Sequence, residues 1–192
     1  MLFYLIAYLF MNLGAFAVVA FLRNQAGSED LGSFRGLVRR SPWMVVTLAL
    51  FLLSLLGIPP LAGFVAKFQI FSVLFQEGQR YSAAGETGLG AILYGLLVVG
   101  GLNSVLSAVY YIKVMKEMIL EPRAEDLEGR EPQYLPEPFP AVLYATVVAG
   151  VVVALGIVWG PLDLASRRGM DRFRPQPEAR SVALTQRGEG QP

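Results

Sequence analysis

Residues 54–68 read SLLGIPPLAGFVAKF, and this stretch decides how the chain crosses a membrane. It lies within an apolar run, residues 43–76, that contains Lys67 as its single charge. One straight helix of this length would measure about 51 Å, whereas a bilayer core is about 30 Å thick. Two adjacent prolines also remove backbone donors and clash with the preceding turn. The pattern predicts one crossing by a helix that is discontinuous at Gly57–Pro60, with non-helical backbone over residues 57–62. A continuous helix with a proline kink is the alternative.

Three further runs without any charge accompany this one, at residues 2–22, 89–112 and 139–160. Each is about as long as the roughly 20 residues that a helix needs to span a bilayer. Hydrophobic residues make up 54% of the chain and charged residues 16%, so the apolar residues are concentrated in blocks. We therefore expect an all-α integral membrane protein with four transmembrane helices over residues 1–162. The polar segment 163–192, rich in Arg, Pro, Gly and Gln, is expected to be disordered.

The basic residues of the connections predict which side of the membrane each connection faces. Residues 23–41 and 113–138 hold four Lys or Arg each, and residues 77–88 hold one. Because short cytoplasmic loops carry an excess of positive charge, the first two are placed in the cytoplasm. The loop at 77–88 and the tail are then outside, although six arginines in the tail oppose this orientation.

Several kinds of chemistry are excluded by residue types that the chain lacks. It has no cysteine, which excludes disulfides, iron–sulfur ligation and thiol catalysis, and no histidine, the commonest metal ligand and general base. The formal net charge of +1 indicates no nucleic-acid partner. We expect no metal site and no cofactor-binding site in this chain.

Lys67 is the strongest candidate for a functional residue. An ionisable side chain inside a membrane segment costs about 2.5–3.5 kcal/mol, so such residues commonly serve a function. Lys67 precedes Gln76 by nine residues, about 13 Å along a helix, which is too deep for its stem to reach the interface fully. It also follows Pro60 by two turns and shares a helix face with Gly63. A lysine beside unwound backbone favours a proton-handling role, and a structural cation is the alternative. The predicted break comprises Gly57, Pro59, Pro60 and Gly63.

Two pairs of polar residues are candidates for a hydrated path. Tyr8 and Asn12 lie one helical turn apart in the first run, and Asn103 and Ser107 do so in the third. Interhelical hydrogen bonds and close helix packing are the alternatives for these side chains. Aromatic residues near the ends of the runs are assigned to the membrane interfaces, namely Trp43, Tyr110, Tyr111 and Trp159.

Residues 54–68 resemble a signature of the antiporter-like membrane subunits of respiratory complex I, the NADH-quinone oxidoreductase, with relatives in multisubunit sodium/proton antiporters. Three more segments resemble the subunit N branch of that family. They are YLFMNLGAF at 8–16, the loop from Glu29-Asp30-Leu31 through Phe34-Arg35-Gly36-Leu37, and SAVYY at 107–111. The larger subunits usually carry histidine and lysine in the helix before the broken one. Here that helix has Tyr8 and Asn12 instead, which also favours subunit N.

The resemblance implies that the four spans are the last four of a fourteen-helix fold, and that the first ten helices are missing from this sequence. It implies a non-redox subunit that couples quinone reduction to proton translocation through hydrated half-channels meeting near Lys67. NADH, flavin, iron–sulfur clusters and quinone are expected on other subunits. The implied partners are other complex I membrane subunits, the missing helices and the lipid bilayer of the inner (plasma) membrane. No independent catalytic activity is expected.

Two other functions stay open on these residues. A subunit of a multisubunit sodium/proton antiporter would use the same lysine but would be driven by ion gradients. A structural membrane scaffold would use Lys67 only to pair with a buried acid.

The predicted topology can be tested in this cysteine-free chain with single cysteines at Ser33 and Ser82. In intact cells, a membrane-impermeant thiol reagent should label position 82 and leave position 33 unlabelled, because loop charges place them on opposite sides. Labelling of position 33 but not of position 82 would reverse the orientation.

Overall fold

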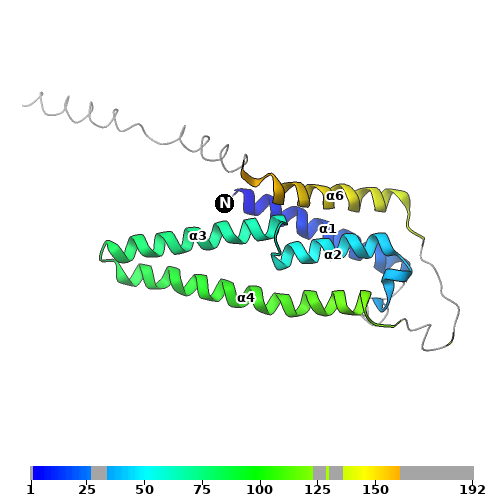
Figure 1. Cartoon of the computed structure of the whole chain (residues 1–192), viewed down its shortest axis with the longest axis horizontal. Helices are drawn as coiled ribbons and strands as arrows, with labels where there is room; N and C mark the ends of the chain where they lie inside the picture. The colour runs from blue at the N-terminus through cyan, green and yellow to red at the C-terminus, as the bar shows by residue number, and fades with distance from the viewer. Residues whose placement is uncertain (1, 27–33, 123–128, 130–135, 161–192) are drawn as a thin grey trace, which may run out of the picture. The chain divides into compact units, whose positions relative to one another are not determined.

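A computed structural model of the chain describes residues 2–26, 34–122, 129 and 136–160. The helices α1 (Leu2–Ala26), α2 (Pro42–Leu56), α3 (Ala62–Ala83), α4 (Thr87–Ile119) and α6 (Phe139–Ile157), with the short 3-10 helix η2 (Leu37–Arg39), belong to one compact unit. Figure 1 shows α1, α2 and α6 running beside one another, and α3 and α4 forming a long hairpin. The predicted all-α membrane fold with a discontinuous second segment is confirmed. The predicted disordered tail, 163–192, lies outside the described residues.

Two of the expected loops are shorter than the sequence indicated. The segment 77–88 was expected to be a polar connection, but α3 continues to Ala83 and only Ala84–Glu86 separates it from α4. In the same way, α4 extends seven residues beyond the end of the apolar run at 112. Charged residues end a run that suits lipid but do not end a helix, because their helix propensity is as high as that of most apolar residues.

Helices α1, α2 and α6 pack into the core of the unit. The ring of Phe51 on α2 lies against Gly14 on α1, where any side chain would overlap it. On α6, Ala141, Ala145 and Ala149 are buried at four-residue spacing. Small residues repeated in this way let two helix backbones approach closely, which is the usual basis of helix association in membranes.

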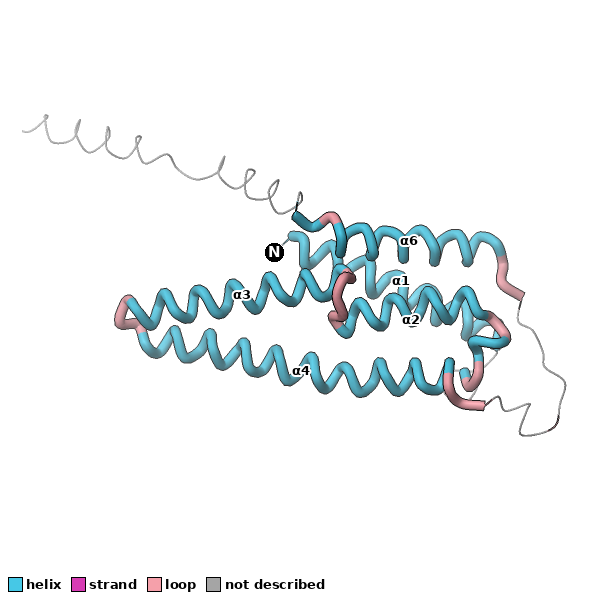
Figure 2. Tube along the Cα trace, in the orientation of Figure 1, coloured by secondary structure: helices cyan, strands magenta, loops and turns pink. Residues whose placement is uncertain are grey.

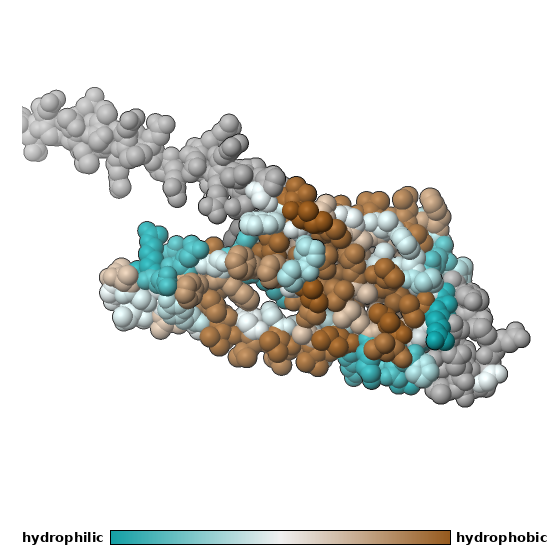
Figure 3. Space-filling model, in the orientation of Figure 1, coloured by the Kyte–Doolittle hydropathy of each residue, from teal (hydrophilic) through white to brown (hydrophobic). Residues whose placement is uncertain are grey.

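The helices carry apolar side chains along the middle of the unit. Among the described residues, three helical segments are long and apolar enough to cross a membrane, at Phe3–Gln25, Thr87–Ile119 and Phe139–Ile157, and α2 is a shorter apolar helix. Figure 3 shows hydrophobic side chains along the middle of the unit and hydrophilic ones gathered at its two ends. Since a bilayer has an apolar centre and polar faces, this distribution fits helices that lie across it.

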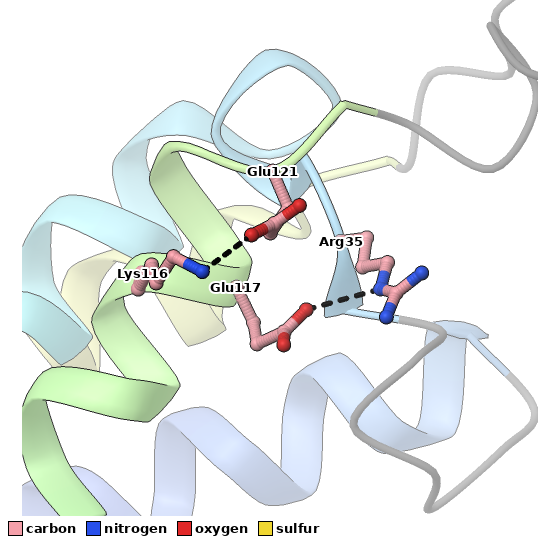
Figure 4. Close-up of polar contacts among 4 residues, drawn as sticks. All are labelled: Arg35, Lys116, Glu117 and Glu121. Atoms are coloured by element: carbon pink, nitrogen blue, oxygen red, sulfur yellow. Dashed lines mark hydrogen bonds and ion pairs between the residues drawn. The ribbon is translucent and has the colours of Figure 1, made fainter. Parts of the chain in front are cut away.

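Ion pairs fasten the connections at the end of the unit where α4 terminates. Figure 4 shows Arg35 donating to a carboxylate oxygen of Glu117 at 3.0 Å and Lys116 donating to Glu121 at 2.8 Å. The backbone N–H of Gly36 also donates to the carbonyl of Glu117, at 3.1 Å. The hydrogen bond and charge of Lys116 hold the pKa of Glu121 below its usual range, so this exposed pair is ionised at neutral pH.

The first turn of α2 is capped by a carboxylate from far along the chain. One oxygen of Glu137 accepts hydrogen bonds from the Ser41 hydroxyl at 2.7 Å, the Trp43 N–H at 3.0 Å and the Met44 N–H at 3.3 Å. The first N–H groups of a helix lack partners within it and carry partial positive charge. Glu137 therefore supplies the acceptor that the first N–H groups of α2 lack, and it links the start of α6 to the start of α2.

The cap predicts that alanine substitutions at two glutamates differ in their effect on the stability of the protein. Replacing Glu137 by alanine strands two backbone donors and should cost about 1–2 kcal/mol. Glu86 precedes α4 and makes no side-chain cap bond, so Glu86→Ala serves as the matched control. Thermal unfolding of the complete protein in detergent should therefore show a clear loss of stability for Glu137→Ala and little for Glu86→Ala. Equal effects would contradict the capping role.

Candidate functional site

The break between α2 and α3 runs from Gly57 to Leu61. Gly57 adopts a left-handed conformation with φ of 91°. Its N–H donates to the carbonyl of Ser54, and the N–H of Ile58 donates to that of Leu53, at 3.0 and 3.2 Å. These two bonds form a Schellman motif, which ends a helix by turning the chain at a glycine. Figure 2 shows the resulting loop between the two helices. The predicted break is confirmed, although Ala62 is already the first residue of α3.

The prolines sit where the chain has left the helix. Pro59 and Pro60 have no N–H to contribute, and the next donor, on Leu61, bonds to the carbonyl of Ile58 at 3.0 Å. The Pro59–Pro60 peptide bond is cis. Opposite this segment, Gly156 on α6 lies so close that a Cβ there would overlap the carbonyl oxygen of Pro60.

Gly63 brings the first turn of α3 against the end of α2. Its N–H donates to the hydroxyl oxygen of Ser54 at 3.2 Å, and that hydroxyl contacts the sulfur of Met11 on α1 at 2.9 Å. A Cβ on Gly63 would overlap the carbonyl oxygen of Ser54. Helices α1 and α6 contact the break from two sides, but Ile58, Pro59 and Pro60 are exposed in this chain. Membrane proteins tolerate irregular backbone only where protein or a water-filled cavity surrounds it.

The side chain of Lys67 on α3 reaches back to the carbonyl end of α2. Its ammonium group donates to the carbonyl of Leu56 at 3.2 Å, and its stem packs over Gly57. The carbonyl end of a helix carries partial negative charge, so a cation there is favourable. Within the described part of the chain, Lys67 makes no ion pair. Gly63, which was predicted to be part of the break, lies instead in the first turn of α3, and Lys67 follows it one turn later.

A cavity of about 420 Å³ opens beside Lys67, between α1, α3 and α4, with Leu55 of α2 at its edge. Its lining combines apolar side chains with a group of polar ones. The polar group consists of Tyr4, Tyr8, Lys67, Asn103, Ser104, Ser107 and Tyr111.

Three of the four residues assigned to a hydrated path line this cavity, namely Tyr8, Asn103 and Ser107. The fourth, Asn12, does not. Its amide donates to the carbonyl of Tyr8 at 2.8 Å, one turn earlier on the same helix. The Ser107 hydroxyl likewise donates to the carbonyl of Asn103 at 2.8 Å, which leaves its oxygen lone pairs to accept from a water. Whether water occupies the cavity stays a prediction.

Tyr111 was assigned to the membrane interface but faces the cavity, while its neighbour Tyr110 is 70% exposed. The sequence spacing could have predicted this position. Asn103, Ser107 and Tyr111 recur every four residues and therefore share one face of α4. Tyr4 was also missed, and it stacks on Tyr8 with ring centroids 5.7 Å apart. In the described ranges, no three metal-ligating side chains gather.

Comparisons with known proteins identify several relatives of this chain. Residues 1–92 match the family model described as "NADH:quinone oxidoreductase/Mrp antiporter, TM". The NADH-quinone oxidoreductase subunit N 2 of Sorangium cellulosum is 40% identical over 86% of this chain and 30% of its own length. Subunit N of Anaeromyxobacter sp. is 34% identical over 89% of this chain and 31% of its own length.

A solved structure agrees with these relatives. Respiratory complex I from Thermus thermophilus with bound aureothin contains a chain that is 28% identical to this one, with a TM-score of 0.56. The match covers 82% of this chain and 32% of that chain. The present chain thus spans about a third of the length of the proteins it matches.

The close contact at Gly63 predicts a strong effect of a single methyl group. Gly63→Ala should cost about 1–3 kcal/mol or more, because the added carbon meets backbone that cannot move aside easily. Gly88→Ala, near the start of α4, adds the same methyl group where nothing lies within 4 Å. The measurement is the fraction of the complete protein that survives heating in detergent. Indistinguishable melting of the two variants would refute the tight junction.

Proposed function

Because the chain belongs to the family of antiporter-like membrane subunits of NADH-quinone oxidoreductases, we propose that it forms part of a proton-translocating unit of respiratory complex I. The chain would take part in coupling quinone reduction to proton movement without binding a redox group itself. NADH, flavin, iron–sulfur clusters and quinone would reside on other subunits. The rest of its own subunit, the other membrane subunits and the lipids of the inner (plasma) membrane would be its partners.

One observation carries this proposal: a lysine held at a helix break lines a cavity whose other polar groups can bind water. Lys67 reaches both the carbonyl of Leu56 and the cavity. An ammonium group can release a proton and take it back, whereas the guanidinium of arginine keeps its proton at any accessible pH. Lys67 would therefore serve as a relay that holds a proton between two hydrated half-channels.

The contact with Leu56 gives the relay a physical means of control. While charged, the ammonium is attracted to the partial negative charge at the end of α2. When neutral, it loses most of that attraction and is freer to leave the carbonyl. A charge that changes elsewhere in the complex would shift the balance between these two states. The proton on Lys67 would thereby respond to events in other subunits.

The alternatives make different use of the same geometry. The family description also names Mrp antiporters, but the relatives with the printed names above are NADH-quinone oxidoreductase subunits. In a scaffold, Lys67 would only cap the carbonyl end of α2, and any side chain that held a positive charge there would suffice.

Substitutions of Lys67 in the complete, assembled complex separate a relay from a cap. Lys67→Ala should lower proton pumping per electron at least about twofold, because a group that transfers protons is lost. Lys67→Arg should not restore pumping, since arginine does not release its proton. Lys113→Ala, an exposed lysine of α4, is the control and should pump normally.

The readout is proton pumping in membrane vesicles, normalised to the amount of assembled complex. Full pumping by Lys67→Arg together with poor assembly of Lys67→Ala would show that Lys67 only caps the carbonyl end of α2 and does not relay protons. Normal pumping by Lys67→Ala would refute the relay.

A further inference from the structure

Helix α4 leaves one of its faces uncovered by the rest of the described chain. Within its apolar window of 18 residues, 6% are buried, against 33% in α1 and in α6. The uncovered residues recur about every three or four positions, so they share one side of the helix, and none of them lines the cavity. This exposed face of α4 consists of Val98, Leu102, Val105, Leu106, Val109 and Ile112.

Two exposed lysines follow on the same side of the helix. Lys113 and Lys116 come four and seven residues after Val109, which places them one and two turns beyond it. The ammonium of Lys116 donates to Glu121 at 2.8 Å and keeps two further N–H groups for another acceptor. Within the described ranges, Lys113 makes no ion pair. The exposed face therefore ends in donors that are available to an anion.

Positive charge is in excess at this end of α4. Figure 4 shows the carboxylate of Glu117 turned toward Arg35 and that of Glu121 turned toward Lys116. Each of these two carboxylates thus has a cation of its own, and Lys113 is the third cation. Three cations against two anions leave one net positive charge, which would attract a negatively charged group at the membrane surface.

The dimensions of the exposed face match one leaflet of a bilayer. From Val98 to Val109 the helix advances 11 residues, about 16 Å, and half of a bilayer core is about 15 Å thick. Lys113 lies about 6 Å farther along, and the polar headgroup region adds about 5–7 Å beyond the core. Between them Tyr110 is 70% exposed, at the depth where tyrosines meet the membrane interface. Figure 3 shows the same change, from hydrophobic side chains along α4 to hydrophilic ones where it ends.

We propose that this face binds an anionic phospholipid, in the leaflet at the end of α4 where Arg35 binds Glu117. Lys113 and Lys116 bind its phosphate, and its acyl chains lie along the exposed face. A lipid supplies both things that this face lacks, namely apolar chains and an anion. A zwitterionic lipid is a poorer ligand, because its own ammonium group would meet the net positive charge. The site is separate from the cavity and does not depend on the proposed role of Lys67.

Photochemical cross-linking in the complete, assembled complex tests the site. The complex is reconstituted into phosphatidylcholine vesicles that contain a trace of a lipid with a diazirine in one acyl chain. The probe is either phosphatidylglycerol, which is anionic, or phosphatidylcholine, and mass spectrometry measures its attachment to residues 98–112. Phosphatidylglycerol should label this segment about fivefold more, because one net positive charge near the surface contributes about a factor of five in affinity. High salt should reduce that ratio.

Variants of the basic residues separate a site from general attraction to the surface. Lys113→Gln removes the net charge and should bring the labelling ratio close to one. Lys113→Arg should keep the ratio, because a guanidinium also binds phosphate. Arg80→Gln is the matched control, since it removes a cation that is 79% exposed near the end of α3 and should leave the ratio unchanged. Both probes are compared on the same preparation, so a lower yield of one variant does not alter its ratio.

Three results would overturn the proposal. Equal labelling of the unchanged chain by the two probes would show that ordinary bilayer lipid covers this face. Absence of labelling by either probe would show that a protein helix covers it. A ratio that Lys113→Gln leaves as high as before, or that Arg80→Gln lowers as much, would show that Lys113 does not bind the headgroup.

Discussion

Lipid offers no hydrogen bonds to a polypeptide, and this constraint governs the arrangement around the break. Five residues outside the helices, Gly57–Leu61, lie between α2 and α3. The Schellman bonds of Gly57 and Ile58 satisfy part of the exposed carbonyl end of α2, and Lys67 satisfies another part. The hydroxyl oxygen of Ser54 accepts a hydrogen bond from the N–H of Gly63 in the first turn of α3. The break is thus held by matched donors and acceptors at the facing ends of α2 and α3.

The same matching explains why a cation can reside there. A lysine inside a bilayer costs several kcal/mol when isolated, but the end of α2 supplies partial negative charge without introducing a carboxylate. A carboxylate would hold the ammonium in an ion pair and oppose release of its proton. A carbonyl binds it more weakly. The site therefore combines a charge that the fold accommodates with a proton that can still be exchanged.

The features that sequence predicted best are those with strong local causes. Adjacent prolines beside a glycine define the break, and a lone charge in an apolar run identifies Lys67. Helices α3 and α4 extend beyond the predicted spans because hydropathy reports where lipid ends and not where helical hydrogen bonding ends. The amide of Asn12 bonds to its own helix, a choice that composition does not reveal. Tyr111 fitted both an interfacial position and a cavity-lining stripe, and only the packing of α3 on α4 decides between them.

Helix α2 is contacted at both of its ends, by Glu137 at its start and by Lys67 at its end. A helix of 15 residues is a stiff rod about 22 Å long. The carboxylate of Glu137 accepts hydrogen bonds at the first end, and the Leu56 carbonyl at the other end accepts one from Lys67. The cap and the lysine therefore contact the two ends of one stiff helix, whose length sets the distance between the capped end and the Leu56 carbonyl at about 22 Å.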